Sequence, residues 1–271
     1  MFNSNPDVVG VDFSGAAKAG RHIWIAECSD SDEMLTVDRC YAAETEVETD
    51  ERDRVLERLC AAISSAESCV VGLDFPFGIP KTVAGTSEWK TFVEGFEYES
   101  PDRFHEECKT AAVDACGKSY VSRETEDELV GGLCSYDWQI RSQTYYGIRG
   151  VLRELLDKNV GVRPMQDSDS VDVVEVYPAA TFDKIGAERT GYKQKRQESH
   201  DTRRTNLETL QTADGELRAV EFSDEVLRDY ALCDDNALDS VVCALAAARA
   251  RDNGFKTDCD RYDPVEGYIY V

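Results

Sequence analysis

Short apolar runs separated by polar turns mark the strands of this chain. Residues 7–13 (DVVGVDF) and 69–75 (CVVGLDF) are almost continuously apolar, which is typical of central strands that are covered on both faces. Residues 21–28 and 34–41 alternate in part and are joined by the polar SDSDE, a pattern that predicts an antiparallel pair. Two further strands are predicted, at 171–178 and in the closing EGYIYV.

Helical periodicity fills most of the remaining sequence. Residues 48–66 place Val55, Leu59, Ala62 and Ile63 on one face and acids in the first turn, which predicts an amphipathic helix. The region from about 80 to 165 is expected to be mainly helical, with a helix start at Ser100-Pro101. Long helical patterns are also found at 135–158, 193–211 and 223–253.

This order of elements predicts one α/β domain over residues 1–271. We expect a mixed sheet of the five-stranded type with helices on both faces and a helical insertion at about 80–165. The helix at 48–66 would act as a crossover, so that the fourth strand runs parallel to the first. Parallel neighbours end at the same edge of a sheet, where ligand sites of α/β proteins generally lie.

Acidic side chains stand at that edge. Asp12 and Asp74 each end a buried strand, and Glu175 lies in a third strand. Asp235 and Asp239 are four residues apart in an apolar helical segment, so both project from one face. Carboxylates that converge repel one another unless a cation neutralises them, and oxygen ligands favour Mg²⁺ or Mn²⁺. These five acids are therefore the candidate catalytic residues, and the four aspartates are the candidate metal ligands.

Each acid also has a structural interpretation. Asp12 and Asp74 can form turns through their own side chains, and Asp234 or Asp235 can cap a helix. Glu175 can pair with an arginine. The coincidence of all these acids in one domain favours the metal site.

Composition adds an unusual surface charge. The chain has 54 acids and 30 bases, a net charge of −24, and resembles proteins of salt-accumulating organisms, in which screening weakens self-repulsion. At low salt such a charge argues against nucleic acid as a partner. Ten scattered cysteines without a Cys-x-x-Cys pair, and only three histidines, disfavour zinc and predict reduced, buried thiols.

No apolar run of about 18 residues occurs, and the first residues lack the pattern of a secretory signal. We therefore expect a cytoplasmic protein without a membrane span. The sequence does not predict its oligomeric state.

Basic residues suggest where phosphate would bind. The segment GYKQKRQESHDTRRT carries five bases against two acids, in contrast to the rest of the chain, and Lys193 is its first base. The alternative is a solvated helix face with ion pairs. Arg141, on the predicted helix at 135–158, is a second candidate, although an arginine beside an apolar stripe is often only amphipathic. The three histidines form no cluster and receive no role.

Together, VVGVDFSG, VVGLDFPFGIP, RSQTYYGIRGVL, VEVYPAATF, GYKQ and DDNALDSVVCALAA resemble an uncharacterised predicted-nuclease family of the ribonuclease H-like superfamily. The resemblance covers Val8 to about Val271. It implies metal positions at Asp12 and Asp74, a helix ligand at Asp239 with Asp235 as second candidate, and an auxiliary Glu175. The implied activity is two-metal phosphodiester hydrolysis with nucleic acid as the substrate.

Two other classes of function remain open. GVDFSG loosely fits the strand-one motif of the sugar kinase and actin superfamily, which implies a phosphotransferase or ATPase; a second copy of the fold is missing from this sequence. A non-catalytic protein that binds nucleic acid or a nucleotide is the other alternative.

Overall fold

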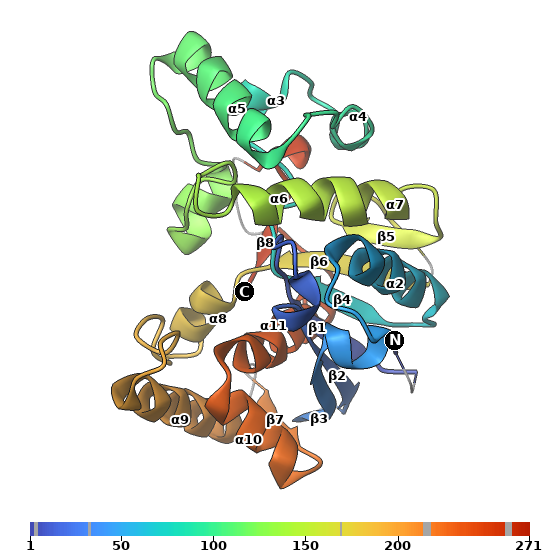
Figure 1. The fold of residues 1–271 in the computed structure, drawn as a ribbon, viewed down its shortest axis with the longest axis vertical. Helices are drawn as coiled ribbons and strands as arrows, with labels where there is room; N and C mark the ends of the chain where they lie inside the picture. The colour runs from blue at the N-terminus through green and yellow to red at the C-terminus, as the bar shows by residue number, and fades with distance from the viewer. Residues whose placement is uncertain (3–4, 32–33, 169, 214–217, 258–261) are drawn as a thin grey trace.

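A mixed β-sheet forms the centre of the protein (Figure 1). The structure is a computed structural model and describes residues 1–2, 5–31, 34–168, 170–213, 218–257 and 262–271. Within these ranges the sheet has eight strands, in the order β5-β6-β4-β1-β2-β3-β7 with β8 paired to β6. Their bounds are β1 Val8–Asp12, β2 Trp24–Asp30, β3 Met34–Ala42, β4 Val70–Leu73, β5 Val160–Arg163, β6 Val171–Val176, β7 Ala219–Phe222 and β8 Ile269–Tyr270.

The pairing of the central strands confirms the prediction from the crossover helix. β1 and β4 run parallel in a register that pairs Val8 with Val70 and Val11 with Leu73, while β2 is antiparallel to both β1 and β3. The prediction of a five-stranded type of sheet was too small. β5 falls in the region expected to be helical, and neither it nor β7 was predicted, because VGVR and AVEF lack the longer apolar run that marks β4 in CVVGLDF.

Helices cover both faces of the sheet, as predicted. One face packs Val9, Val11 and Val71 against α2 (Arg52–Ser65) and the helical segment from α6 (Arg141–Gly147) to α7 (Arg153–Leu155). The other face packs Val8 and Val70 against α11 (Asp235–Asp252), which contacts β1, β2, β3 and β4. The two layers are seen on opposite sides of the strands in Figure 1.

A pair of glycines sets how closely α11 approaches the sheet. Gly10 of β1 and Gly72 of β4 are partners in the parallel register. A methyl group at Gly10 would lie 2.0 Å from the carbonyl oxygen of Ser240, and one at Gly72 would lie 2.4 Å from that of Cys243. The backbone of α11 therefore rests directly on these two strands, and its N-terminal part is carried to their ends.

The chain between β4 and β5 is mainly helical. Ser100 caps α5 by accepting a hydrogen bond from the amide of Arg103, as expected for Ser-Pro. The long helix predicted at 135–158 begins only at Arg141, and its middle turns are of the wider π type. The helical elements of this segment are α3 Lys81–Ala84, α4 Trp89–Glu94, α5 Pro101–Cys116, η2 Glu126–Val130, α6 Arg141–Gly147, η3 Ile148–Leu152 and α7 Arg153–Leu155.

The helices expected at 48–66, 193–211 and 223–253 are all present, the last as two helices, whereas those at 19–21, 43–47, 178–184 and 264–266 were not predicted. The helix expected at 48–66 is α2, and all four residues assigned to its apolar face are buried. The remaining elements are η1 Ala19–Arg21, α1 Ala43–Val47, α8 Pro178–Lys184, α9 Gln197–Thr212, α10 Glu225–Cys233 and η5 Pro264–Glu266. None of the described helices is both long and apolar enough to cross a membrane.

The cysteines largely follow the prediction of reduced core thiols. Nine of the ten lie in the described part of the chain, and all nine are free. Seven are buried, whereas Cys116 and Cys233 are exposed. Cys259 lies outside the described residues.

Candidate functional site

The ends of β1 and β4 bring two acids to the same edge of the sheet. Asp12 is the last residue of β1, and Asp74 directly follows β4. The amide of Asp74 donates to the carbonyl of Val11 over 3.1 Å, which ties the two strand ends together. Gln143 of α6 donates from its side-chain amide to the carbonyl of Asp74. The predicted pairing of the strand ends is confirmed.

Helix α11, which packs on one face of the sheet, adds a third carboxylate. Asp239 lies one turn into the helix and is only 1% exposed. Its position follows from the close packing of α11 on Gly10 and Gly72, because Ser240, the next residue, is the one that contacts Gly10. Asp12, Asp74 and Asp239 therefore form one group, the acidic cluster.

The pKa of each carboxyl group in the acidic cluster is raised. Burial raises the pKa of Asp12 well above its usual range, and the charges of Asp239 and Asp74 raise it further. Burial raises the pKa of Asp74 to about 7, although the ammonium of Lys193 opposes that rise. Burial also raises the pKa of Asp239, again against Lys193. Three acids this close require a compensating positive charge.

Lys193 supplies one such charge. Its ammonium nitrogen lies 2.6 Å from Oδ2 of Asp239. Burial by itself lowers the pKa of Lys193, but the charges of Asp239, Asp74 and Asp12 outweigh it and raise the pKa well above the usual range. The other carboxylate oxygen of Asp239, Oδ1, is buried without a hydrogen-bond partner. A buried anionic oxygen without a partner is costly and indicates a site for a cation or a donor.

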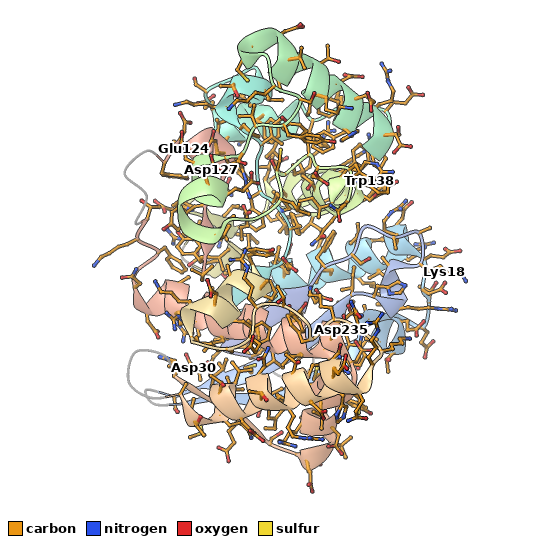
Figure 2. The ribbon with its side chains drawn as sticks, turned by 90° about the vertical axis from the view of Figure 1, so that its left-hand side faces the viewer. Lys18, Asp30, Glu124, Asp127, Trp138 and Asp235 are labelled. Carbon is orange, nitrogen blue, oxygen red and sulfur yellow. The ribbon has the colours of Figure 1, made fainter. Side chains whose placement is uncertain are left out.

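The second helix acid is less deeply placed. Asp234 caps α11 by accepting a hydrogen bond from the amide of Asn236 over 2.9 Å. The helix cap predicted at Asp234 or Asp235 is therefore Asp234. Asp235 is the first residue of the helix (Figure 2) and is partly buried. Burial raises its pKa, and the charge of Asp234 adds to the rise. Asp235 thus borders the acidic cluster without joining its centre.

A cavity of about 420 Å³ opens at the acidic cluster. Asp12, Asp74 and Lys193 line it, and Asn236 comes from the start of α11. Four of its polar residues had not been predicted as site residues: Ser14, His22, Gln143 and Asn236. RSQTYYG was recognised as a motif, but only Arg141 was selected from it. The position of Gln143 depends on how α6 packs, which no local pattern encodes.

The carboxylate oxygens of the acidic cluster are suitable ligands for a hard cation, but the three side chains are not arranged around a common metal position. Carboxylate oxygens are the preferred ligands of Mg²⁺ and Mn²⁺, and Oδ1 of Asp239 accepts no hydrogen bond, although the nearby hydroxyl of Tyr192 opposes the rise in the pKa of Asp239 that burial causes. In the described part of the chain, however, no group of three or more His, Cys, Asp or Glu side chains is arranged to hold a metal ion. Lys193 occupies Oδ2 of Asp239 instead. The chemistry of the residues fits a metal, and the side chains would have to move to surround it.

Glu175 forms an ion pair with an arginine, which was the structural alternative considered for it in the sequence. Arg123 is 1% exposed and donates to both carboxylate oxygens of Glu175 over 2.8 and 2.5 Å. The amide of Phe77 also donates to Glu175, and Arg123 pairs with Glu126 as well. A cavity of about 220 Å³ lies here and shares Asp74, Gln143 and Lys193 with the larger one. Glu175 is therefore a neighbour of the acidic cluster whose oxygens are already bonded.

The predicted phosphate-binding bases are used in different ways. Arg141 forms an ion pair with Asp102 over 2.7 Å and donates to the carbonyl of Trp138, and it is not among the residues that line the cavity. The basic segment is only partly a solvated face. Arg203 is buried and bonds to the carbonyls of Tyr192 and Leu232, so it organises the backbone and does not face solvent. Lys195 and Arg196 are exposed.

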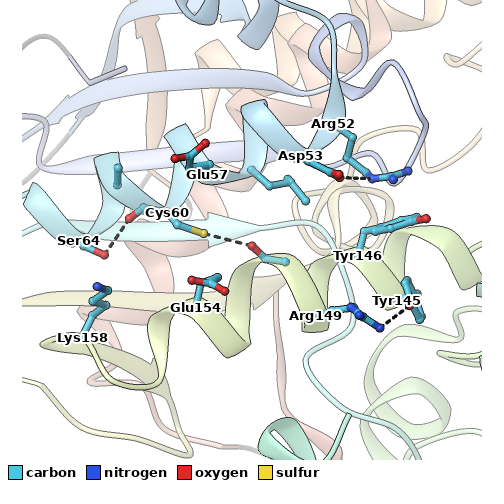
Figure 3. A pocket seen from close by; sticks show the side chains of 13 residues that line it. Arg52, Asp53, Glu57, Cys60, Ser64, Tyr145, Tyr146, Arg149, Glu154 and Lys158 are labelled. Atoms are coloured by element: carbon cyan, nitrogen blue, oxygen red, sulfur yellow. Dashed lines mark hydrogen bonds and ion pairs between the residues drawn. The ribbon is translucent and has the colours of Figure 1, made fainter. Parts of the chain in front are cut away.

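A larger groove of about 690 Å³ lies between α2 and the α6–α7 segment (Figure 3). Its charges are mixed in sign, and several are already bonded: Arg52 pairs with Asp53, and Arg149 donates to the hydroxyl of Tyr145. The thiol of Cys60 donates to the carbonyl of Gly150. Among the described residues that line this groove, no buried side-chain oxygen or nitrogen lacks a partner. The acidic cluster is therefore the stronger candidate site.

These features define a mixed α/β protein with an acidic pocket at the ends of two parallel strands. The chain belongs to the family described as protein of unknown function DUF429, whose model matches residues 10–259. No curated protein and no solved structure matches it significantly.

Proposed function

We propose that this protein is a metal-dependent hydrolase of phosphodiesters, a nuclease of the ribonuclease H-like superfamily. One observation carries the proposal: Asp12, Asp74 and Asp239 converge from two strand ends and a helix, and a buried oxygen of Asp239 has no partner. An acid at the end of strand one, another after strand four and a third on the last long helix is the arrangement that the resemblance implies. The parallel pairing of β1 with β4, whose ends carry Asp12 and Asp74, supports this arrangement, and α11 carries Asp239.

The proposed reaction is hydrolysis of one phosphodiester bond. The oxygen of a water molecule bonds to phosphorus, the bond from phosphorus to the leaving ester oxygen breaks, and that oxygen takes a proton. The products are a phosphomonoester and a free hydroxyl. Bound Mg²⁺ or Mn²⁺ supplies a lowered pKa for the attacking water and charge stabilisation at the leaving oxygen.

The residues of this chain would have separate tasks. Asp12, Asp74 and Oδ1 of Asp239 would hold the cation, with Asp235 at the border. Lys193 would face the negative charge of the phosphate, since it lines both cavities. The side chains of Gln143 and Asn236 would position the substrate from the two helices α6 and α11.

The test is strand cleavage. Labelled single-stranded, hybrid and branched nucleic acids are incubated with Mn²⁺ in about 1 M KCl, where surface charge is screened. Cleavage that requires Mn²⁺ and falls at least about 100-fold in Asp74→Asn, with Lys195→Met unchanged, supports the proposal.

Two results would overturn it. Hydrolysis of ATP with intact nucleic acid would favour the phosphotransferase or ATPase class. Binding of nucleic acid or a nucleotide without turnover would favour the non-catalytic class.

A further inference from the structure

We infer that Lys193 takes the place of one of the two ions of a two-metal site, so that the acidic cluster binds a single divalent cation. The inference rests on the proposed function and concerns how that site is charged. It revises the expectation, carried by the family resemblance, that two ions are bound.

The charge of the pocket supports one ion. Asp12, Asp74 and Asp239 carry three negative charges when ionised, and Lys193 carries one positive charge. One divalent cation neutralises the remainder. Two divalent ions beside Lys193 would leave two positive charges in excess next to Asp12 and Asp239, which are only 7% and 1% exposed. Uncompensated charge of either sign is expensive in such surroundings.

The geometry at Asp239 points the same way. An ammonium nitrogen 2.6 Å from Oδ2 is at hydrogen-bond distance, so this oxygen is not available to bridge two ions. Only Oδ1 remains, and it is the buried atom without a partner. Asp239 therefore has one oxygen for a resident cation and one for Lys193.

The segment that carries Lys193 is anchored. Tyr192 is 1% exposed, and its ring packs against Phe182 with centroids 5.0 Å apart. The carbonyls of Tyr192 and Gln194 both accept hydrogen bonds from the buried guanidinium of Arg203, which also donates to Leu232 over 2.8 Å. The backbone on both sides of Lys193 is thus fixed. Arg203 is a positioning residue that holds the lysine at the pocket.

The stoichiometry of Mn²⁺ binding tests the inference without any need for activity. Calorimetric titration, checked by electron paramagnetic resonance of free Mn²⁺, is carried out in about 1 M KCl to screen weak surface binding. Asp12→Asn, titrated in parallel, corrects for binding outside the pocket. We expect one ion per chain for the wild type and for the control Lys195→Met. We expect two for Lys193→Met, with the first bound about tenfold more tightly because a nearby positive charge has been removed.

Each outcome has a definite meaning, once circular dichroism shows that Lys193→Met is folded. Two ions in the wild type, or one ion in both the wild type and Lys193→Met, would overturn the inference and leave the metal-dependent function standing. No Mn²⁺ bound by the wild type beyond the Asp12→Asn reference would overturn the proposed function itself.

Discussion

Asp74 illustrates how burial in the pocket affects the ionisation of a single side chain. Burial and its acidic neighbours raise its pKa to about 7, so the folded protein favours the protonated form of Asp74 over a pH range in which the unfolded chain is ionised. Ionising Asp74 near neutral pH therefore works against folding unless a cation compensates it. Sites that retain such a cost are often functional.

The pH dependence of stability follows from this shift. The folded pKa of Asp74 lies above the unfolded value of 3.8, so its contribution to stability is complete below pH 3.8 and is lost as the pH rises through about 7. Asp74→Asn removes the ionisable group and keeps its shape. In a metal-free buffer with chelator, we expect the variant to be more stable than the wild type at pH 8 by about 1–4 kcal/mol.

Urea unfolding of both proteins at pH 4, 6 and 8 measures this difference. The gain should shrink toward zero at pH 4, where the carboxyl group is largely neutral in the folded wild type. A variant that is equally destabilised at all three values would show that Asp74 is not under electrostatic stress.

At this scale the sequence predicted the acids but not their partners. Asp12, Asp74 and Asp239 could be selected because strand ends and helical spacing are visible in the pattern of residues. The contact of Lys193 with Asp239 joins a loop to a helix 46 positions away, and the pairing of Arg123 with Glu175 spans 52 positions. Such contacts depend on tertiary packing. The sequence therefore could not predict that, within the basic segment, Lys193 lines the pocket and Arg203 is buried.

Helix α11 and the two strands beneath it determine whether the acidic cluster exists. The helix rests on Gly10 and Gly72, and any side chain at these positions would push it outward. Its residues from Ala237 to Ala248 are buried throughout, so it is apolar on nearly all sides. The position of Asp239 is therefore set by the packing of a whole element.

Gly72→Ala tests this packing. The added methyl group would lie 2.4 Å from the carbonyl oxygen of Cys243 and 3.1 Å from the Cβ atom of Ala247. We expect a loss of about 1–3 kcal/mol in the free energy of unfolding, as for other overpacked cores. Gly132→Ala is the matched control, since its methyl group would meet its nearest atoms at 3.5 Å.

Denaturant unfolding of the two variants provides the comparison. If Gly72→Ala were as stable as Gly132→Ala, the helix would have room that the structure does not give it.

The elements themselves were predicted where an apolar run or a helical period marks them in the sequence. The central strands β1 and β4 and the helices α2 and α11 stood out because long apolar runs or a clear 3.6-residue period mark them. The short strands β5 and β7 did not. In the predicted 135–158 helix, residues before Arg141 form turns, although their composition is compatible with a helix. Propensity alone does not position such ends.

Over the whole molecule, the net charge of −24 acts against the compact state. The repulsion is long-ranged at low salt and is screened when the Debye length falls from about 10 Å at 0.1 M to about 3 Å at 1 M. The acidic composition is therefore expected to make stability depend on salt, independently of the pocket.

A thermal scan in KCl tests this expectation. Between 0.1 and 1 M KCl we expect the Tm to rise by at least about 5 °C, equivalent to about 3 kcal/mol for a chain of this size. A Tm that stays flat or decreases over this range would show that surface repulsion has little influence on stability.

The central claim is that Asp12, Asp74 and Asp239 gather around a cation. A crystal structure of the wild type grown with Mn²⁺, with anomalous data collected near the manganese absorption edge, tests it most directly. The account predicts one anomalous peak bound by oxygens of these three aspartates, with Lys193 still on Oδ2 of Asp239. Full occupancy of surface acids by Mn²⁺, with no peak among the three aspartates, would contradict it.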